Sequence, residues 1–169
     1  MELLIYLFAS LFSVLNPIGT VPIFVGLTQE FSKKDRSRIA LMTAFNVFLI
    51  LIISYFVGQY VLTFFGITID ALRIAGGIII AHSGFSLLNK KFTKSRGINK
   101  EIEVDIQKRN DIALTPLAIP MLAGPGSISL LIAFYQDHHQ TWDIVFSSLA
   151  ILAVAISIFI VLKSAHYLS

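Results

Sequence analysis

The sequence contains no cysteine and little charge. Of its 169 residues, 14% are charged and 56% are hydrophobic, and the mean hydropathy is +0.80. The missing cysteine excludes disulfides and thiolate metal centres. Soluble domains carry about 25% charged residues, so the scarcity of charge excludes that class. The sequence pI of about 9.3 does not indicate a nucleic-acid partner, because the basic residues follow the pattern of membrane topology.

Charge is missing altogether from five stretches of the chain. A charge at the bilayer centre costs about 2.5–3.5 kcal/mol on insertion scales, and a spanning helix needs about 20 apolar residues. The third stretch is short, but its helix can begin near Asp70 if Arg73 snorkels and pairs with Asp70. We therefore predict an all-α polytopic bundle, a single membrane domain over 1–169, with five spans at about 3–29, 39–65, 70–89, 112–136 and 144–162.

Positive charge is nearly absent from one side of this bundle. Twelve of the thirteen Lys and Arg residues lie in the connections 30–38 and 90–111 or at Lys163, whereas Arg73 is the only cation on the other side. The positive-inside rule predicts a cell (inner) membrane protein with its N-terminus outside and both connections cytoplasmic. The N-terminus has no basic segment typical of a signal peptide, so we expect a retained helix. The lipid bilayer is the first expected partner.

All five prolines lie inside two predicted spans, at positions 17 and 22 of the first and 116, 120 and 125 of the fourth. Each proline removes a helical N–H and clashes with the preceding turn, so both helices are expected to be broken. The Asn-Pro step at 16–17 and the Gly-Pro step at 124–125 lie at the centres of their spans. Irregular backbone at the bilayer midplane survives only when it is buried in protein or lines a polar cavity.

The two broken spans begin on opposite sides of the membrane, which predicts an inverted three-plus-three repeat. Secondary transporters often bind solutes where such discontinuous helices meet. Two kinks that only shape helix packing are the alternative. If the breaks form a site, new helix ends suit a carboxylate, while freed carbonyls and the Asn16 oxygen suit an ammonium group. The candidate binding residues are Asn16, Pro17, Gly19, Thr20, Gly124, Pro125, Gly126 and Ser127.

Three segments resemble a known family. The segments NPIGTVPIF at 16–24, PLAIPMLAGPGSI at 116–128 and ALRIAGG at 71–77 resemble the signatures of the MarC family of bacterial and archaeal integral membrane proteins. The resemblance covers essentially the whole chain. It implies a six-helix inner-membrane fold and, as in some relatives, transport of small neutral amino acids such as glycine and alanine. With five spans the chain is one helix short, so we expect a truncated form, with completion by a partner as the alternative.

The expected function is secondary transport of small neutral amino acids or similar solutes, and a non-transporting membrane subunit is the alternative. A coupling ion and a homo-oligomer stay open. No acidic residue lies deep in a span, so no catalytic residue, cofactor or metal site is expected. Ser127 with His82 as its base is a weak enzyme candidate. A stripe of small residues in the third span is expected to pack closely against another helix, namely Gly77, Ala81 and Gly84.

Overall fold

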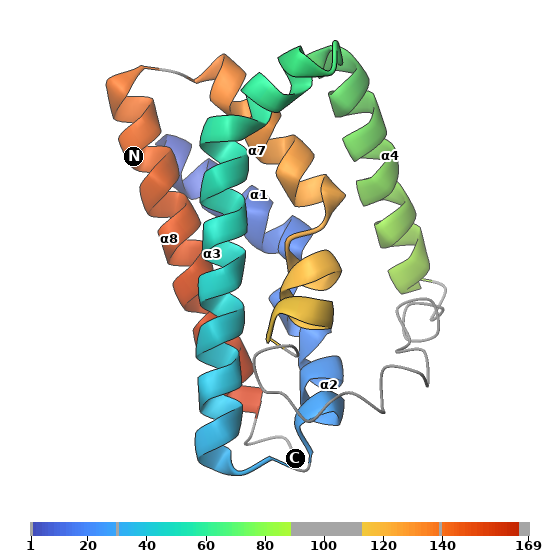
Figure 1. Cartoon of the computed structure of the whole chain (residues 1–169), viewed down its shortest axis with the longest axis vertical. Coiled ribbons are helices and arrows are strands. Elements are labelled where there is room, and N and C mark those ends of the chain that lie inside the picture. The colour runs from blue at the N-terminus through green and yellow to red at the C-terminus, as the bar shows by residue number, and fades with distance from the viewer. Residues whose placement is uncertain (1, 30, 89–112, 139, 166–169) are drawn as a thin grey trace.

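The computed structural model describes residues 2–29, 31–88, 113–138 and 140–165 (Figure 1). Within these ranges the chain is helical and contains no strand, which confirms the all-α class. The expected connection 90–111 lies outside the described residues. The helices are α1 (Glu2–Leu15), α2 (Pro17–Thr28), α3 (Lys33–Phe64), α4 (Ile69–Leu88), η2 (Ala113–Leu122), α7 (Pro125–Asp137) and α8 (Thr141–Ser164).

Two helices, α3 and α8, are long and apolar enough to cross a membrane. The 24 residues of α8 extend about 36 Å at 1.5 Å per residue, which exceeds the about 30 Å hydrocarbon core of a bilayer. The bent pair α1–α2 makes a third such span if the two helices are counted together. The fold is therefore a helical bundle with at least two membrane-spanning helices.

The long helices α3 and α8 lie at the centre of the helix contacts in the bundle. α3 and α8 pack side by side, with α1 and α2 against α8 and with η2 and α7 against α3 (Figure 1). The faces turned toward this centre are aliphatic. On α1, for example, Leu7, Leu11 and Leu15 recur every four residues and are buried, because positions i and i+4 share one face of a helix. Close van der Waals packing of such faces associates helices in lipid.

Two helix breaks lie where the prolines predict them. α1 ends at Leu15 and α2 begins at Pro17 after a bend of 41°. η2 ends at Leu122 and α7 begins at Pro125. The other prolines do not end a helix. Positions 116 and 120 lie within η2, a π-helix, and position 22 lies inside α2. In a π-helix the hydrogen bonds join residues five apart, so the wider turns of η2 run through both prolines.

α4 lies at the edge of the bundle and packs chiefly against α7. Its contact with α7 runs through Gly76, where an added Cβ would lie 2.6 Å from the Ser129 Cβ. The expected packing stripe is therefore wrong for the residues whose surroundings are described. A Cβ added at Gly77 would meet nothing within 4 Å, and Ala81 is exposed. One residue turns a helix by 100°, so the face that α4 presents to α7 is set by packing and not by the small-residue spacing alone.

Candidate functional site

The first break is closed by its own polar groups. Asn16 adopts a left-handed backbone conformation, with φ 45° and ψ 60°, and its side chain caps α2. Asn Oδ1 accepts from the Gly19 amide at 3.1 Å, and the Thr20 hydroxyl donates to the Asn16 carbonyl at 3.3 Å. The sequence predicted that the Gly19 amide and the Asn16 oxygen would be available to a solute. In the structure they bond to each other, because Asn tolerates the left-handed conformation that a cap at this bend requires.

The second break is more open. Gly124 is the N-cap of α7 and has no side chain that could accept from the first-turn amides. The hydroxyl of Ser127 donates to the Gly124 carbonyl at 2.9 Å, and that of Ser129 donates to the Pro125 carbonyl at 2.7 Å. These bonds satisfy carbonyl groups and leave the amides at the start of α7 without a side-chain cap. The positive end of the α7 dipole is therefore the better anion-binding end of the two.

The two breaks lie close together. α1 contacts α7, and α2 contacts η2, so the broken helices cross near their interruptions (Figure 1). A Cβ added to Gly126 would lie 2.9 Å from Ile80 Cγ1 of α4 and 3.6 Å from Val14 Cγ1 of α1. Of the eight predicted site residues, four are buried, namely Pro17, Thr20, Gly126 and Ser127. Three are partly buried, namely Asn16, Gly19 and Gly124, and Pro125 is exposed.

A groove of about 270 Å³ runs between α1, α4 and α7. Along α7 it extends from Asp137 back to Gly126, which is about 16 Å of helix. Among the described residues that line the groove, only Gly126 belongs to the eight predicted site residues. The others are Tyr6, Arg73, Gly76, Gly77, Ile80, Ser129, Leu130, Ala133, Phe134 and Asp137.

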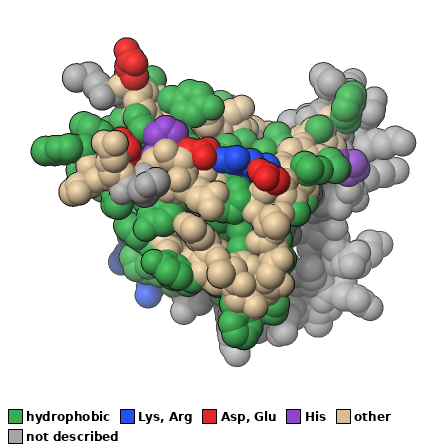
Figure 2. Space-filling view, turned by 90° about the horizontal axis from the view of Figure 1, so that it is seen from above, with side chains coloured by type: hydrophobic (Ala, Val, Ile, Leu, Met, Phe, Trp, Pro, Cys, Tyr) green, Lys and Arg blue, Asp and Glu red, His purple; other side chains and the backbone are tan. Residues whose placement is uncertain are grey.

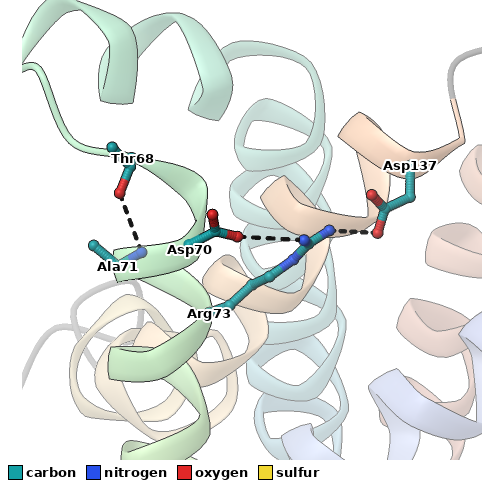
Figure 3. A network of polar contacts seen from close by, with 5 residues as sticks. All are labelled: Thr68, Asp70, Ala71, Arg73 and Asp137. Carbon is teal, nitrogen blue, oxygen red and sulfur yellow. Dashed lines mark hydrogen bonds and ion pairs between the residues drawn. The ribbon is translucent and has the colours of Figure 1, made fainter.

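An ion pair lies at the end of this groove that is opposite Gly126. Arg73 of α4 extends between Asp70 on its own helix, at 3.7 Å, and Asp137, the last residue of α7 (Figure 3). The predicted Asp70–Arg73 pair is therefore confirmed, and Asp137 is a partner that sequence spacing did not indicate. A carboxylate at a helix C-terminus is unfavourable next to the negative end of the dipole. The guanidinium of Arg73 offsets this cost and connects α4 to α7.

The charged groups of this end form a band. Figure 2 shows acidic, basic and histidine side chains gathered across the end of the bundle where α3 joins α4. The side chains of Arg73 and Asp137 are 41% and 55% exposed. Below them the groove has an aromatic wall, in which the ring of Tyr6 stacks on Phe134 at 6.3 Å. An apolar wall with a few convergent polar groups is typical of ligand-binding sites.

The weaker sequence candidates are not brought together. Ser127 is buried and donates to Gly124, whereas His82 is exposed on α4. Neither residue lines the groove. Within the described part of the chain, no three His, Cys, Asp or Glu residues are grouped as metal ligands. A larger hollow of about 710 Å³ opens at the same end, lined by Gln59, Tyr60, Thr63, Phe64, Tyr135 and Gln136. It reaches neither helix break.

Comparison with known proteins decides the family. Residues 1–169 match the family model described as "MarC family integral membrane protein". The chain belongs to the MarC family of integral membrane proteins. The sequence resemblance is thereby confirmed, and the bilayer is the environment of the protein. No solved structure gives a significant match.

Three relatives illustrate the similarity. The chain is 41% identical over 149 residues to a UPF0056 membrane protein of Buchnera aphidicola subsp. Schizaphis graminum, covering 88% of this chain and 68% of the relative. It is 38% identical over 158 residues to one of Methanocaldococcus jannaschii, covering 94% and 75%. It is 40% identical over 129 residues to the inner membrane protein MarC of Escherichia coli O1:K1, covering 75% and 58%. The matched regions thus span between 58% and 75% of these relatives.

Proposed function

We propose that this protein is a secondary transporter of small zwitterionic solutes, such as glycine and alanine, in the cell (inner) membrane. The observation that carries the proposal is the groove that joins the Arg73–Asp137 pair to the open helix end at Gly126. The five spans of one membrane domain would place the N-terminus outside and the basic connections inside.

The packing pattern supports an inverted repeat. In the first half of the chain, α1 is the first segment of the broken helix, and it packs against α8 of the second half. In the second half, η2 is the first segment of the broken helix, and it packs against α3 of the first half. The second segments do the same, with α2 on α8 and α7 on α3. Exchange of the two halves leaves this pattern unchanged, as expected for a two-fold axis in the membrane plane. Transporters of this architecture bind solutes near that axis, where the breaks lie.

The chemistry of the groove suits a zwitterion. The fork of the Arg73 guanidinium matches a carboxylate, and the Asp137 carboxylate matches an ammonium group. At the inner end, the amides of Gly126 and Ser127 stand at the positive end of α7 and favour a carboxylate. The volume of about 270 Å³ lies just below the range of about 300–1,000 Å³ for drug-sized ligands, which favours a solute of few atoms.

The first break lies beside the proposed site, in the helix pair that contacts the second broken helix. The four predicted residues of this break do not line the groove, but they belong to the broken helix that contacts α7 and η2; they are Asn16, Pro17, Gly19 and Thr20. Because the Asn16 cap joins α2 to the bend, these residues position the solute and Gly124, Pro125, Gly126 and Ser127 supply the open helix end. Rearrangement of the cap during transport would free the Asn16 oxygen for an ammonium group.

Uptake of labelled glycine and alanine into proteoliposomes tests the proposal. In Gly126→Val a branched side chain enters a position where even a Cβ meets Ile80 at 2.9 Å, so solute affinity should fall more than tenfold. Gly26→Val is the matched control, because nothing lies within 4 Å of a Cβ at that position. It should leave uptake within twofold of the parent. Uptake driven by a sodium or proton gradient would identify the coupling ion.

Specific results would reject the proposal. Absence of uptake for both amino acids in a folded protein, under every gradient tested, would exclude transport of these solutes. Uptake that is equal in the parent and in Gly126→Val would exclude the groove as the binding site. The second result would contradict the proposed binding site but not the proposed transport.

A non-transporting membrane subunit is the second candidate. The edge helix α4 favours it, because Ile74, Ile78 and Phe85 are between 64% and 66% exposed and offer a surface to a membrane partner. This function predicts a stoichiometric complex with another membrane protein after mild solubilisation. A protein that purifies alone and still takes up glycine would exclude it.

A further inference from the structure

A second hollow lies at the opposite end of the bundle, where α2, α3 and α8 meet. It has a volume of about 260 Å³ and is separate from the groove. Of the seven described residues that line it, four are basic and none is acidic. They are Phe24, Lys33, Lys34, Arg36, Ser37, Leu162 and Lys163.

The start of α3 makes this hollow strongly positive. Lys33, Lys34 and Arg36 stand in the first turn of a 32-residue helix, so the positive end of its dipole adds to their charge. The nearby carboxylate of Asp35 accepts from the Ser32 hydroxyl at 2.8 Å and does not line the hollow. The site therefore combines two sources of positive potential on one helix.

The basic groups come from different elements and are held in place. Arg36 donates to the Gln29 carbonyl at 2.8 Å and to the Phe31 carbonyl at 3.1 Å, which fixes it beside the end of α2. Lys163 belongs to the last turn of α8, and its ammonium group lies 5.3 Å from the centre of the Phe159 ring. An anion in the hollow would thus be surrounded by charges from two helices.

The floor of the hollow is apolar. Phe24 of α2 is 2% exposed and Leu162 of α8 is fully buried. Because both side chains are already buried, the charged residues supply the attraction for a ligand, and the bilayer around this membrane protein presents phosphates on its lipid headgroups. Basic pockets between membrane helices on the cytoplasmic side are known to bind anionic lipid headgroups.

We propose that this hollow binds the headgroup phosphate of an anionic phospholipid. The lysines of α3 and α8 contact the phosphate. Because the site joins α2 to α3 and α8, bound lipid stabilises the second half of the broken helix. This inference is independent of solute transport.

Lipid titration of the purified full chain tests the proposal. Phosphatidylglycerol, phosphatidylcholine with the same acyl chains, and glycerol 1-phosphate are each added, and binding is measured by native mass spectrometry. The parent should bind phosphatidylglycerol at least tenfold more tightly than the other two. Lys163→Gln should weaken that binding about fivefold, and Lys34→Gln/Lys163→Gln about 25-fold, as expected for about 1 kcal/mol per basic residue near an anionic surface.

Arg38→Gln is the matched control, since it removes a charge from an exposed position of the same helix that does not line the hollow. It should change binding less than twofold. Equal binding of phosphatidylglycerol and phosphatidylcholine by the parent would overturn the proposal, as would an effect of Arg38→Gln as large as that of Lys163→Gln. Glycerol 1-phosphate binding as tightly as the lipid would assign the site to a soluble phosphate. If the double variant does not fold, Lys163→Gln alone decides.

Discussion

The contact between α4 and α7 predicts opposite outcomes for two neighbouring glycines. A Cβ at Gly76 would lie 2.6 Å from the Ser129 Cβ, whereas a Cβ at Gly77 meets nothing within 4 Å. Non-bonded carbons rest about 3.5–4.0 Å apart, so Gly76→Ala forces α4 about 1 Å away from α7. Both atoms are Cβ atoms and cannot rotate out of the way. The shift also moves Arg73, one turn earlier, relative to Asp137.

The magnitude follows from the difference between the two variants. Replacement of Gly by Ala in a helix gains about 1 kcal/mol at either position, and this gain cancels in the comparison. Overpacking costs about 1–3 kcal/mol and applies to Gly76→Ala alone. For a chain of this length, 1 kcal/mol corresponds to about 2–4 °C. The midpoint of Gly76→Ala should therefore lie about 2–12 °C below that of Gly77→Ala.

Thermal unfolding in detergent, followed by intrinsic fluorescence, measures this difference. Ser129→Gly removes the opposing Cβ, so the double variant Gly76→Ala/Ser129→Gly should recover most of the lost stability. Equal midpoints for Gly76→Ala and Gly77→Ala would refute the close approach of the two helices. A double variant no more stable than Gly76→Ala would show that the clash does not involve Ser129.

Three further predictions follow from other contacts. Asn16→Ala loses a cap worth about 1 kcal/mol and places alanine in a left-handed conformation, so thermal unfolding should show it to be less stable than Asn16→Gly; equal stability would contradict the left-handed backbone at this position. Gly58→Ala should destabilise the protein by about 1–3 kcal/mol, because an added Cβ would overlap the Ile132 side chain, and Ile132→Ala in the same chain should recover stability in the same assay. In this cysteine-free chain, an impermeant thiol reagent added outside cells should label Gln140→Cys and not Ser164→Cys; the reverse pattern would contradict the topology.

Local sequence features predicted the helices well. Charge-free runs located them because a buried charge is costly in lipid wherever the helix packs. The breaks at Asn16 and Gly124 were also predictable, since a proline removes a hydrogen bond of its own helix. The tolerance of prolines 116 and 120 within η2 and of the proline at 22 within α2 was missed, because the way a helix accommodates a proline depends on the whole segment.

The candidate site was predicted only in part. The sequence indicated Gly126, which lines the groove, but not Arg73 and Asp137 as joint partners. These residues are 64 positions apart, and no local pattern records which helices become neighbours. The bond between Asn16 and the Gly19 amide lies within one turn of chain. It was missed because it depends on the left-handed backbone of Asn16.

The sequence by itself determined the membrane class, the helical content, the family and the two break points, because each depends on the composition, the motifs or the hydrogen bonding of local segments. The tertiary structure decided which face of α4 meets α7, which charges pair across the groove and which broken helix keeps an open end. These features depend on the rotation and neighbours of whole helices. Packing between distant segments fixes both, and it is not written in the spacing of residues along one helix.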